Sequence, residues 1–436
     1  MDHEIDLVAD QDPSRGYRLL PAAPVCAPRE LTVTLRNPAR DIVMISMWSE
    51  TGLLPQPRAS SHSARLSIGA DRIASLSARL ISLWQKFVQF EPVSGTNRPR
   101  EQEPPYIRYA DLSGRPRSEL LAQVSELARE GAYMLGELLV GEEGELARFR
   151  GHLLSVLEHE DLRIRFDSDL GVPWPMLAVG YESLLDGGRL TGDPFRLFLG
   201  HRHQVEATSG AYSDYWWVSD RVRAVGSANL DSDLKSVPLA TDVLQLLGSQ
   251  VQLTERHFRD ELLPDLSRPV LDEDLMYFFC HGSYEEQGGR TWHALRLSDE
   301  LPIDAELVDG YRKPHSEATS RRGTVSLFHP LVVLNTCFAG APATTGFTDL
   351  SAAFVKHGAL GVLAPQIAMP RVFGAEFALR FLTRYLDDGL TAGLALLETV
   401  RWFAATYRNP LALAYGLVCG LDSRIAPAQQ EGTTGS

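Results

Sequence analysis

The feature that most constrains the fold is an alternation of short apolar runs with amphipathic helical segments, from about residue 160 onward. Two of the runs, LMYFFCHG at 275–282 and LVVLNTCFAG at 331–340, begin with apolar residues that show no polar alternation. Such runs are typical of strands that are buried on both faces of a sheet. Strands that alternate with helices indicate an α/β fold with a largely parallel sheet flanked by helices.

The N-terminal part of the chain has a different pattern. Residues 30–49 predict two short strands around an Asn-Pro turn, while residues 71–90 and 117–159 carry apolar residues at helical spacing, the latter with a break at GEEG. We therefore expect four parts, which are an irregular segment (1–28), a smaller α+β region (29–159), an α/β domain (160–425) and a flexible tail (426–436).

Composition narrows the possible functions. A net charge of −14, without an obviously basic region, argues against nucleic-acid binding. No run reaches the about 18 apolar residues that a membrane helix needs, and the acidic N-terminus lacks the apolar core of a secretory signal. The four cysteines contain no CxxC pair, which disfavours a disulfide framework or a zinc site. We expect a cytoplasmic protein with no direct nucleic-acid or membrane partner, no metal and no cofactor.

Each of the two apolar strands ends next to a residue that can do chemistry. His281 follows the first strand and Cys337 follows the second. Ligands of parallel sheets bind outside the carboxyl ends of the strands, so the two side chains would meet at one edge if the strands are neighbours. An imidazole can take the proton of a thiol and return it to a leaving amine. Backbone N–H groups near Gly282 and Cys337 are the candidate oxyanion donors.

A structural role for these residues is the alternative reading. A lone cysteine at a strand end is more often a small buried hydrophobe than a nucleophile. Cys280 would point away from His281 on a strand, which predicts a buried thiol. His201 and His203 would share one face of a strand, but no third metal ligand is evident. The joint occurrence of histidine and then cysteine at corresponding positions is what favours catalysis.

Five segments of residues 160–420 match one known family, which are VPWPML (172–177), LMYFFCHG (275–282), LVVLNTCFAG (331–340), LSAAFVKHGALGVLAP (350–365) and NPLALAYGLVCG (409–420). In these segments the region resembles the CHAT domain, a caspase-like cysteine peptidase module related to separases. The resemblance implies a caspase-like fold in which His281 is the general base and Cys337 the nucleophile, with Gly282 and the Cys337 N–H contributing to the oxyanion site.

The same resemblance carries expectations about biology. It implies a specific protein substrate and control by an activating or inhibitory protein partner. Bacterial relatives often act in antiviral defence or regulated cell death, and some cleave pore-forming, gasdermin-like effectors. The region 29–159 would then be a regulatory or pseudo-caspase-like part of the molecule.

The chain departs from the family after the third apolar strand. Relatives read like Leu-Trp-x-Val-x-Asp there, and the acidic residues favour a basic substrate residue before the scissile bond. Here Ile367 replaces the Trp and Arg371 replaces the Asp. A cation would repel Arg or Lys and attract an acidic or small residue, unless Arg371 only starts a helix and faces solvent. Asp349, as an alternative acid or a helix first-turn residue, and Gln366 complete the candidate substrate-binding set.

Residues 310–324 are rich in Lys and Arg and lie between the histidine and the cysteine. We expect an exposed loop there, and Arg321 and Arg322 make it a candidate regulatory or autocleavage loop. Two rivals to the protease remain open at this point. One is a catalytically silent interaction module that keeps the fold, and the other is a cysteine amidase for a small substrate.

Overall fold

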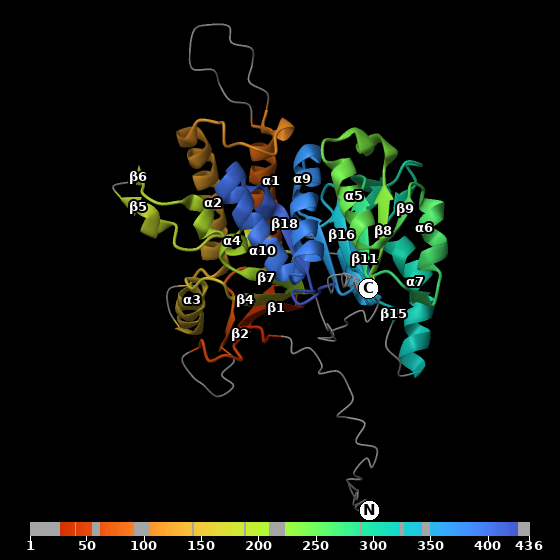
Figure 1. Cartoon of the computed structure of the whole chain (residues 1–436). Helices are drawn as coiled ribbons and strands as arrows, with labels where there is room; N and C mark the ends of the chain where they lie inside the picture. The colour runs from red at the N-terminus through yellow and green to blue at the C-terminus, as the bar shows by residue number, and fades with distance from the viewer. Residues whose placement is uncertain are drawn as a thin grey trace, which may run out of the picture.

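Helices cover both faces of one long sheet in the computed structural model (Figure 1). Within the described residues this sheet has eleven strands, most of them parallel to their neighbours, which confirms the predicted α/β class. The structure describes residues 27–39, 41–54, 62–90, 105–141, 144–186, 189–208, 223–287, 290–322, 327–341 and 349–425.

The order of strands across the sheet mixes the two ends of the chain. The β1–β2, β2–β3 and β17–β18 pairs are antiparallel, and the other neighbours are parallel. From one edge to the other the strands are β3 (His62–Arg65), β2 (Ile42–Trp48), β1 (Leu31–Ala39), β4 (Arg163–Ser168), β7 (Gln204–Thr208), β18 (Tyr415–Val418), β17 (Gly361–Pro365), β16 (Leu331–Asn335), β11 (Leu275–Phe279), β8 (Val225–Leu230) and β9 (Gln252–Arg256).

The helices and the smaller elements surround this sheet. The α-helices are α1 (Ala70–Val88), α2 (Arg117–Leu138), α3 (Gly144–Leu157), α4 (Leu199–Arg202), α5 (Ala240–Gln250), α6 (Arg259–Leu266), α7 (Ala305–Arg322), α8 (Leu350–Lys356), α9 (Arg371–Leu382) and α10 (Ala392–Trp402). The π-helices η7 (Thr383–Asp387) and η8 (Phe403–Tyr407) extend α9 and α10. The short helices are η2 (Tyr106–Arg108), η3 (Trp174–Met176), η4 (Glu182–Leu184), η5 (Pro194–Leu197), η6 (Ser232–Ser236) and η9 (Pro410–Ala414).

Three small sheets complete the described elements. The three-stranded one matters for the site, because its first strand continues directly from the end of β11. These sheets consist of β12 (His281–Gln287), β13 (Arg290–Arg296) and β14 (Pro302–Ile303), of β10 (Val270–Leu271) with β15 (Leu327–Phe328), and of β5 (Leu185–Asp186) with β6 (Arg189–Leu190).

Successive side chains of β11 enter two different cores, which explains its unbroken apolar sequence. Leu275, Tyr277 and Phe279 pack in the core formed with α5, α9 and α10. Met276 and Phe278 point to the opposite face and pack in the core formed with α6, α7 and α8. Because both faces of the central strands are covered, functional groups can be reached only at the strand ends.

The junction between the N-terminal and C-terminal halves of the sheet is narrow. The ladder between β7 and β18 contains a single register pair, Ala207 with Val418. Beside it the fully buried Glu206 accepts hydrogen bonds from Nε of Arg165 (2.9 Å) and from the Leu421 N–H (3.1 Å). This carboxylate therefore links β7 and β4 to the segment that follows β18. Since both halves share one sheet, the domain boundary near residue 159 stays a prediction.

The expectation of an exposed loop at 310–324 is wrong for its described part, because residues up to 322 belong to helix α7. At the start of the helix the Asp304 side chain accepts a hydrogen bond from the Leu307 N–H (2.8 Å). The buried Arg312 donates to backbone carbonyls at the end of α6. Tertiary packing thus stabilises a helix of weak propensity, while residues 323–326 lie outside the described residues.

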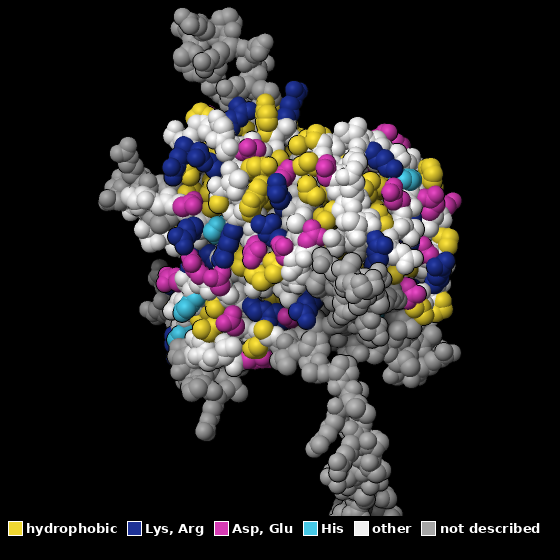
Figure 2. Space-filling view, in the orientation of Figure 1, with side chains coloured by type: hydrophobic (Ala, Val, Ile, Leu, Met, Phe, Trp, Pro, Cys, Tyr) yellow, Lys and Arg dark blue, Asp and Glu magenta, His cyan; other side chains and the backbone are white. Residues whose placement is uncertain are grey.

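Figure 2 shows basic and acidic side chains interspersed over the face that α9 and α10 present, without segregation by sign. None of the described helices is both long enough and apolar enough to span a bilayer. The described residues also contain no group of three or more His, Cys, Asp or Glu side chains arranged to hold a metal ion. His201 lies in α4 and His203 follows it, so these two do not share a strand face as expected.

Candidate active site

Three parallel strands, β8, β11 and β16, end side by side at one edge of the sheet. Register pairs Phe279, the last residue of β11, with Asn335, the last residue of β16. His281 and Cys337 each follow these positions by two residues, and Asp231 directly follows β8. The structure therefore brings both sequence-predicted residues to a common edge and adds a carboxylate to them.

The start of β12 packs directly on the turn that carries Cys337. A Cβ atom at Gly282 would overlap the carbonyl oxygen of Cys337 and would lie 2.9 Å from Nε2 of His293. Only glycine therefore permits this approach of the two backbones. The contact holds His281, which precedes Gly282, next to the segment of the cysteine.

His281 is oriented by an acid that the sequence analysis missed. Its Nε2 lies 3.2 Å from Oδ2 of Asp231, and the imidazole is 43% exposed whereas the carboxylate is nearly buried. The other oxygen of Asp231 accepts the Asp233 N–H (3.0 Å) at the start of η6. With Nε2 engaged, Nδ1 is the ring nitrogen that can accept a proton. The available sequence signal was an acidic residue directly after the strand VGSANL.

The turn that carries Cys337 is strained and tied to the end of β17. Phe338 has a φ of +59°, a left-handed conformation that is uncommon for a bulky residue. Its N–H donates to Ile367 O (3.0 Å), and the Gly340 N–H donates to Pro365 O (2.8 Å). The Cys337 N–H has no such backbone acceptor among the described residues, so it can donate a hydrogen bond to an oxyanion.

The thiol of Cys337 is partly buried and lies 3.8 Å from the carbonyl oxygen of Met369. Burial raises the pKa of this thiol above its usual value, and the charge of Arg371 opposes that shift. At neutral pH the resting thiol is consequently protonated and depends on a base for activation. Arg371 is the exposed first residue of α9, and its charge reaches the thiol.

A second histidine, His293 on β13, contacts the backbone of the nucleophile turn. Its Nε2 donates a hydrogen bond to the carbonyl oxygen of Cys337 (2.7 Å), which fixes the tautomer with the proton on Nε2. Burial lowers the pKa of His293, so the ring stays neutral at pH 7. Sequence reasoning missed this residue because only the register of the β12–β13 hairpin brings it under the turn.

Asn335 anchors the end of the nucleophile strand to three neighbouring elements. Its Oδ1 accepts the Tyr415 hydroxyl of β18 (2.7 Å). Its Nδ2 donates to Gly374 O of α9 (2.8 Å) and to the Tyr277 hydroxyl of β11 (3.3 Å). Because the residue is buried, this network fixes the strand end from which the cysteine turn departs.

The remaining predicted residues separate into different places. Asp349 and Gln366 line one pocket of about 460 Å³ together with Gly340 of the nucleophile turn, and Arg371 is not part of its lining. The Asp349 side chain also caps α8. Cys280 is buried in the core on the α8 face, as predicted.

A second pocket, of about 360 Å³, borders the same turn. It is lined by α1 together with Tyr284, Phe338 and Ala341. Both pockets share the segment 169–171, so they form neighbouring depressions around residues 338–341. Arg321 and Arg322 are the last two residues of α7, and their side chains lie outside the described part of the structure.

Comparisons with known proteins give structural similarity only. No family model matches the chain, and no curated protein matches it in sequence. Two crystal structures of the Saccharomyces cerevisiae separase–securin complex align over 89% of this chain and 30% of theirs, at 10% identity, with TM-scores of 0.45 and 0.41. The Drosophila initiator caspase Dronc aligns over 49% of this chain and 91% of its own, at 10% identity and a TM-score of 0.28.

The chain thus spans about a third of the length of the separase chains that it matches. All three TM-scores are below 0.5.

Proposed function

We propose that the protein is a caspase-like cysteine endopeptidase of the CHAT type, with Cys337 as nucleophile and His281 as general base. The observation that carries the proposal is the packing of Gly282 on the Cys337 carbonyl, which keeps the histidine beside the cysteine turn. The contact between His281 and Asp231 supports it, because a structural histidine in a turn needs no buried carboxylate.

The chemistry follows from the geometry. Nδ1 of His281 takes the thiol proton, and the sulfur of Cys337 attacks the peptide carbonyl carbon. The Cys337 N–H and the backbone near Gly282 stabilise the oxyanion, and the imidazolium then protonates the leaving amine. Water, deprotonated by His281, hydrolyses the thioester and regenerates the thiol. Asp231 holds the ring and stabilises its charged form.

The proposed substrate is a protein, as the resemblance of segments 275–282 and 331–340 to CHAT peptidases implies. Arg371 starts α9 and is exposed, so its charge does not assign the substrate residue before the scissile bond. We extend the proposal to a cytoplasmic enzyme of antiviral defence or cell death. It would act on a gasdermin-like or other effector and be restrained or activated by a protein partner.

The decisive test is cleavage-site profiling of a proteome with wild-type protein and with Cys337→Ala. We expect cleavage sites that appear only with the wild type, and the residue before the cut bond reports the specificity. Labelling of Cys337 by a thiol-reactive peptidyl probe should require His281. Labelling without that requirement, and no cleavage by the partner-activated protein, would favour the silent interaction module. Hydrolysis of small amides without cleavage of any protein would favour the amidase.

Replacing Asp231 with asparagine is expected to lower kcat by about a hundredfold, the lower end of the range of general acid–base contributions. The amide keeps the shape but loses the charge that stabilises the imidazolium. KM should change little, because Asp231 does not border the pockets. The readout is kcat on a cleaved substrate, which should fall for Asp231→Asn and stay unchanged for Asp233→Asn. An unchanged kcat for Asp231→Asn would remove Asp231 from the mechanism.

A further inference from the structure

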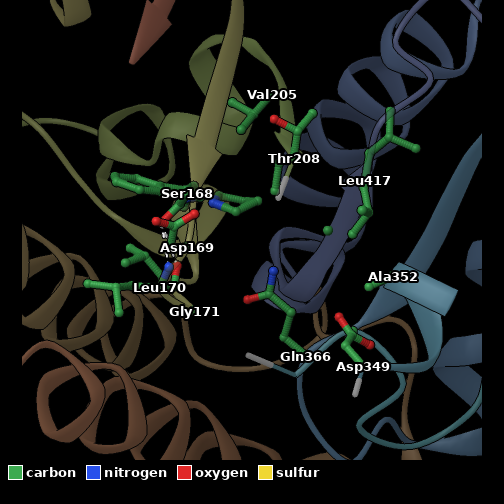
Figure 3. Close-up of a pocket in the computed structure, with 17 residues that line it drawn as sticks. Ser168, Asp169, Leu170, Gly171, Val205, Thr208, Asp349, Ala352, Gln366 and Leu417 are labelled. Carbon is green, nitrogen blue, oxygen red and sulfur yellow. Dashed lines mark hydrogen bonds between the residues drawn. The ribbon is translucent and has the colours of Figure 1, made fainter. Parts of the chain in front are cut away.

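A pocket of about 460 Å³ lies at the junction of the two halves of the sheet, outside the catalytic pair (Figure 3). Its wall combines the end of β4, strands β7 and β18, and the start of α8. This volume is typical of sites for small organic ligands. Most of the lining is apolar and includes Leu170, Val172, Trp174, Val205, Leu417 and Val418.

One polar atom in this pocket is buried without a hydrogen-bond partner among the described residues. It is Oε1 of Gln366, a residue that is only 6% exposed. Figure 3 shows its amide group extending into the space between Asp169 and Asp349. A buried acceptor without a hydrogen bond destabilises the protein. A ligand that donates a hydrogen bond to it removes this penalty, which favours binding.

A second acceptor in the pocket carries charge. Asp349 uses Oδ1 to accept the Ser351 N–H (2.9 Å), and burial raises the pKa of its carboxyl group to about 6. It is therefore mostly ionised at pH 7 and above. The lining residues include no Lys or Arg to neutralise it. The Asp349 carboxylate and the Gln366 amide oxygen thus face one pocket whose other lining residues are mostly apolar. This arrangement is complementary to a cation that bears N–H groups.

The pocket is coupled to the nucleophile turn through the backbone. Gln366 lies between Pro365 and Ile367, the two residues whose carbonyl oxygens accept the N–H groups of Gly340 and Phe338. Its side chain is directed into the pocket while its neighbours hold the turn of the cysteine. A group bound at Gln366 would therefore stabilise the segment that fixes the turn.

The geometry points to a binding site for an organic cation, an ammonium or guanidinium group on a short apolar stem, whose occupancy stabilises the Cys337 turn. The cation is either a free small molecule or the basic side chain of a polypeptide. The binding claim is independent of the proposed peptidase activity, because Cys337 takes no part in the recognition.

Titration calorimetry on the full-length Cys337→Ala protein tests the site, with butylguanidinium as the probe and pentanoate as the anionic control. We expect saturable binding of butylguanidinium and none of pentanoate. Asp349→Asn and Gln366→Leu should each weaken the binding at least tenfold. Asp309→Asn, which removes a carboxylate at the opposite end of α8, should leave it unchanged. Thermal melts check that each variant is folded.

Gln366→Glu is expected to have the opposite effect and to tighten binding of butylguanidinium, because it adds a negative charge without changing the size of the side chain.

Two peptides distinguish the possible sources of the cation. The first is an acetylated tetrapeptide that contains arginine, and the second is its norleucine analogue. If the first binds more tightly than butylguanidinium and the second does not bind, the natural ligand of the pocket is a polypeptide. Preference for butylguanidinium over the arginine peptide assigns it to a small molecule.

The coupling is measured by the rate at which iodoacetamide alkylates wild-type Cys337. Saturating butylguanidinium should slow the reaction severalfold, and Asp349→Asn should abolish this effect. Absence of saturable binding, or equal binding by Asp349→Asn, Gln366→Leu and Gln366→Glu, would overturn the assignment of the site. Binding without any change in alkylation would overturn its coupling to the turn. Neither result depends on whether the protein cleaves peptides.

Discussion

Gly282→Ala is expected to lower the peptidase activity by about a hundredfold or more, because displacement of catalytic groups by about 1 Å has effects of this size. The new methyl group would overlap the Cys337 carbonyl oxygen, and that oxygen is already held by His293. Since the obstacle is backbone, the turn of the cysteine and the start of β12 must separate. The measurement is kcat/KM on a cleaved substrate, together with the alkylation rate of Cys337.

The matched control is Gly136→Ala on the exposed side of α2, where an added Cβ meets no atom. This variant should keep full activity and be stabilised by up to about 1 kcal/mol, the difference in helix propensity. Wild-type kinetics in a folded Gly282→Ala protein would mean that the two backbones are not in contact. The link between His281 and Cys337 on which the proposed function depends would then be lost.

Glu206→Gln is expected to lower the free energy of unfolding by about 3–5 kcal/mol, the cost of removing one partner from a buried ion pair. Glu206 is completely buried and accepts from Nε of both Arg29 (2.6 Å) and Arg165 (2.9 Å). Without the negative charge of Glu206, the two guanidinium groups remain largely buried and lose part of the electrostatic attraction that offsets their desolvation. The Leu421 N–H would also lose a charged acceptor. Urea denaturation, followed by circular dichroism, measures the change.

The control for this second prediction is Glu137→Gln, which breaks the exposed ion pair with Arg72 (2.9 Å). Exposed pairs contribute at most about 1 kcal/mol, so this variant should unfold close to the wild type. A similar small change for Glu206→Gln would show that the junction of the half-sheets does not depend on the carboxylate. A separate early transition in the Glu206 variant would show that the two halves unfold independently.

Much of the fold was predictable because its signals are local. The apolar runs at 275–279 and 331–335 are continuous since each strand is covered on both faces, and this pattern is visible in one dimension. Helix α7 was not predictable in the same way. Pro314 lies inside it and its apolar content is low, so its stability comes from contacts such as Arg312 with the end of α6. Such contacts exist only after the chain has folded.

Some residues of the candidate site could likewise be predicted from local sequence signals, and others could not. His281 and Cys337 could be paired from sequence because equivalent ends of neighbouring parallel strands share an edge. Asp231 was missed because an acid after a strand is equally a helix cap, and in the structure it serves in both ways. His293 requires the exact register of a hairpin that begins at the site itself. Residues that support a site from a distance leave no pattern along the chain.

The position of β7 against β18 has a consequence for self-association. A strand at the border of a sheet exposes unpaired N–H and C=O groups and tends to recruit a strand from another molecule. Here a strand of the same polypeptide already occupies that place, through the Ala207–Val418 pair. On this side, the half of the sheet that carries the cysteine is therefore already paired within its own chain and does not need a strand from a second copy. Copies that join strand to strand would have to use the far borders, at β3 or β9.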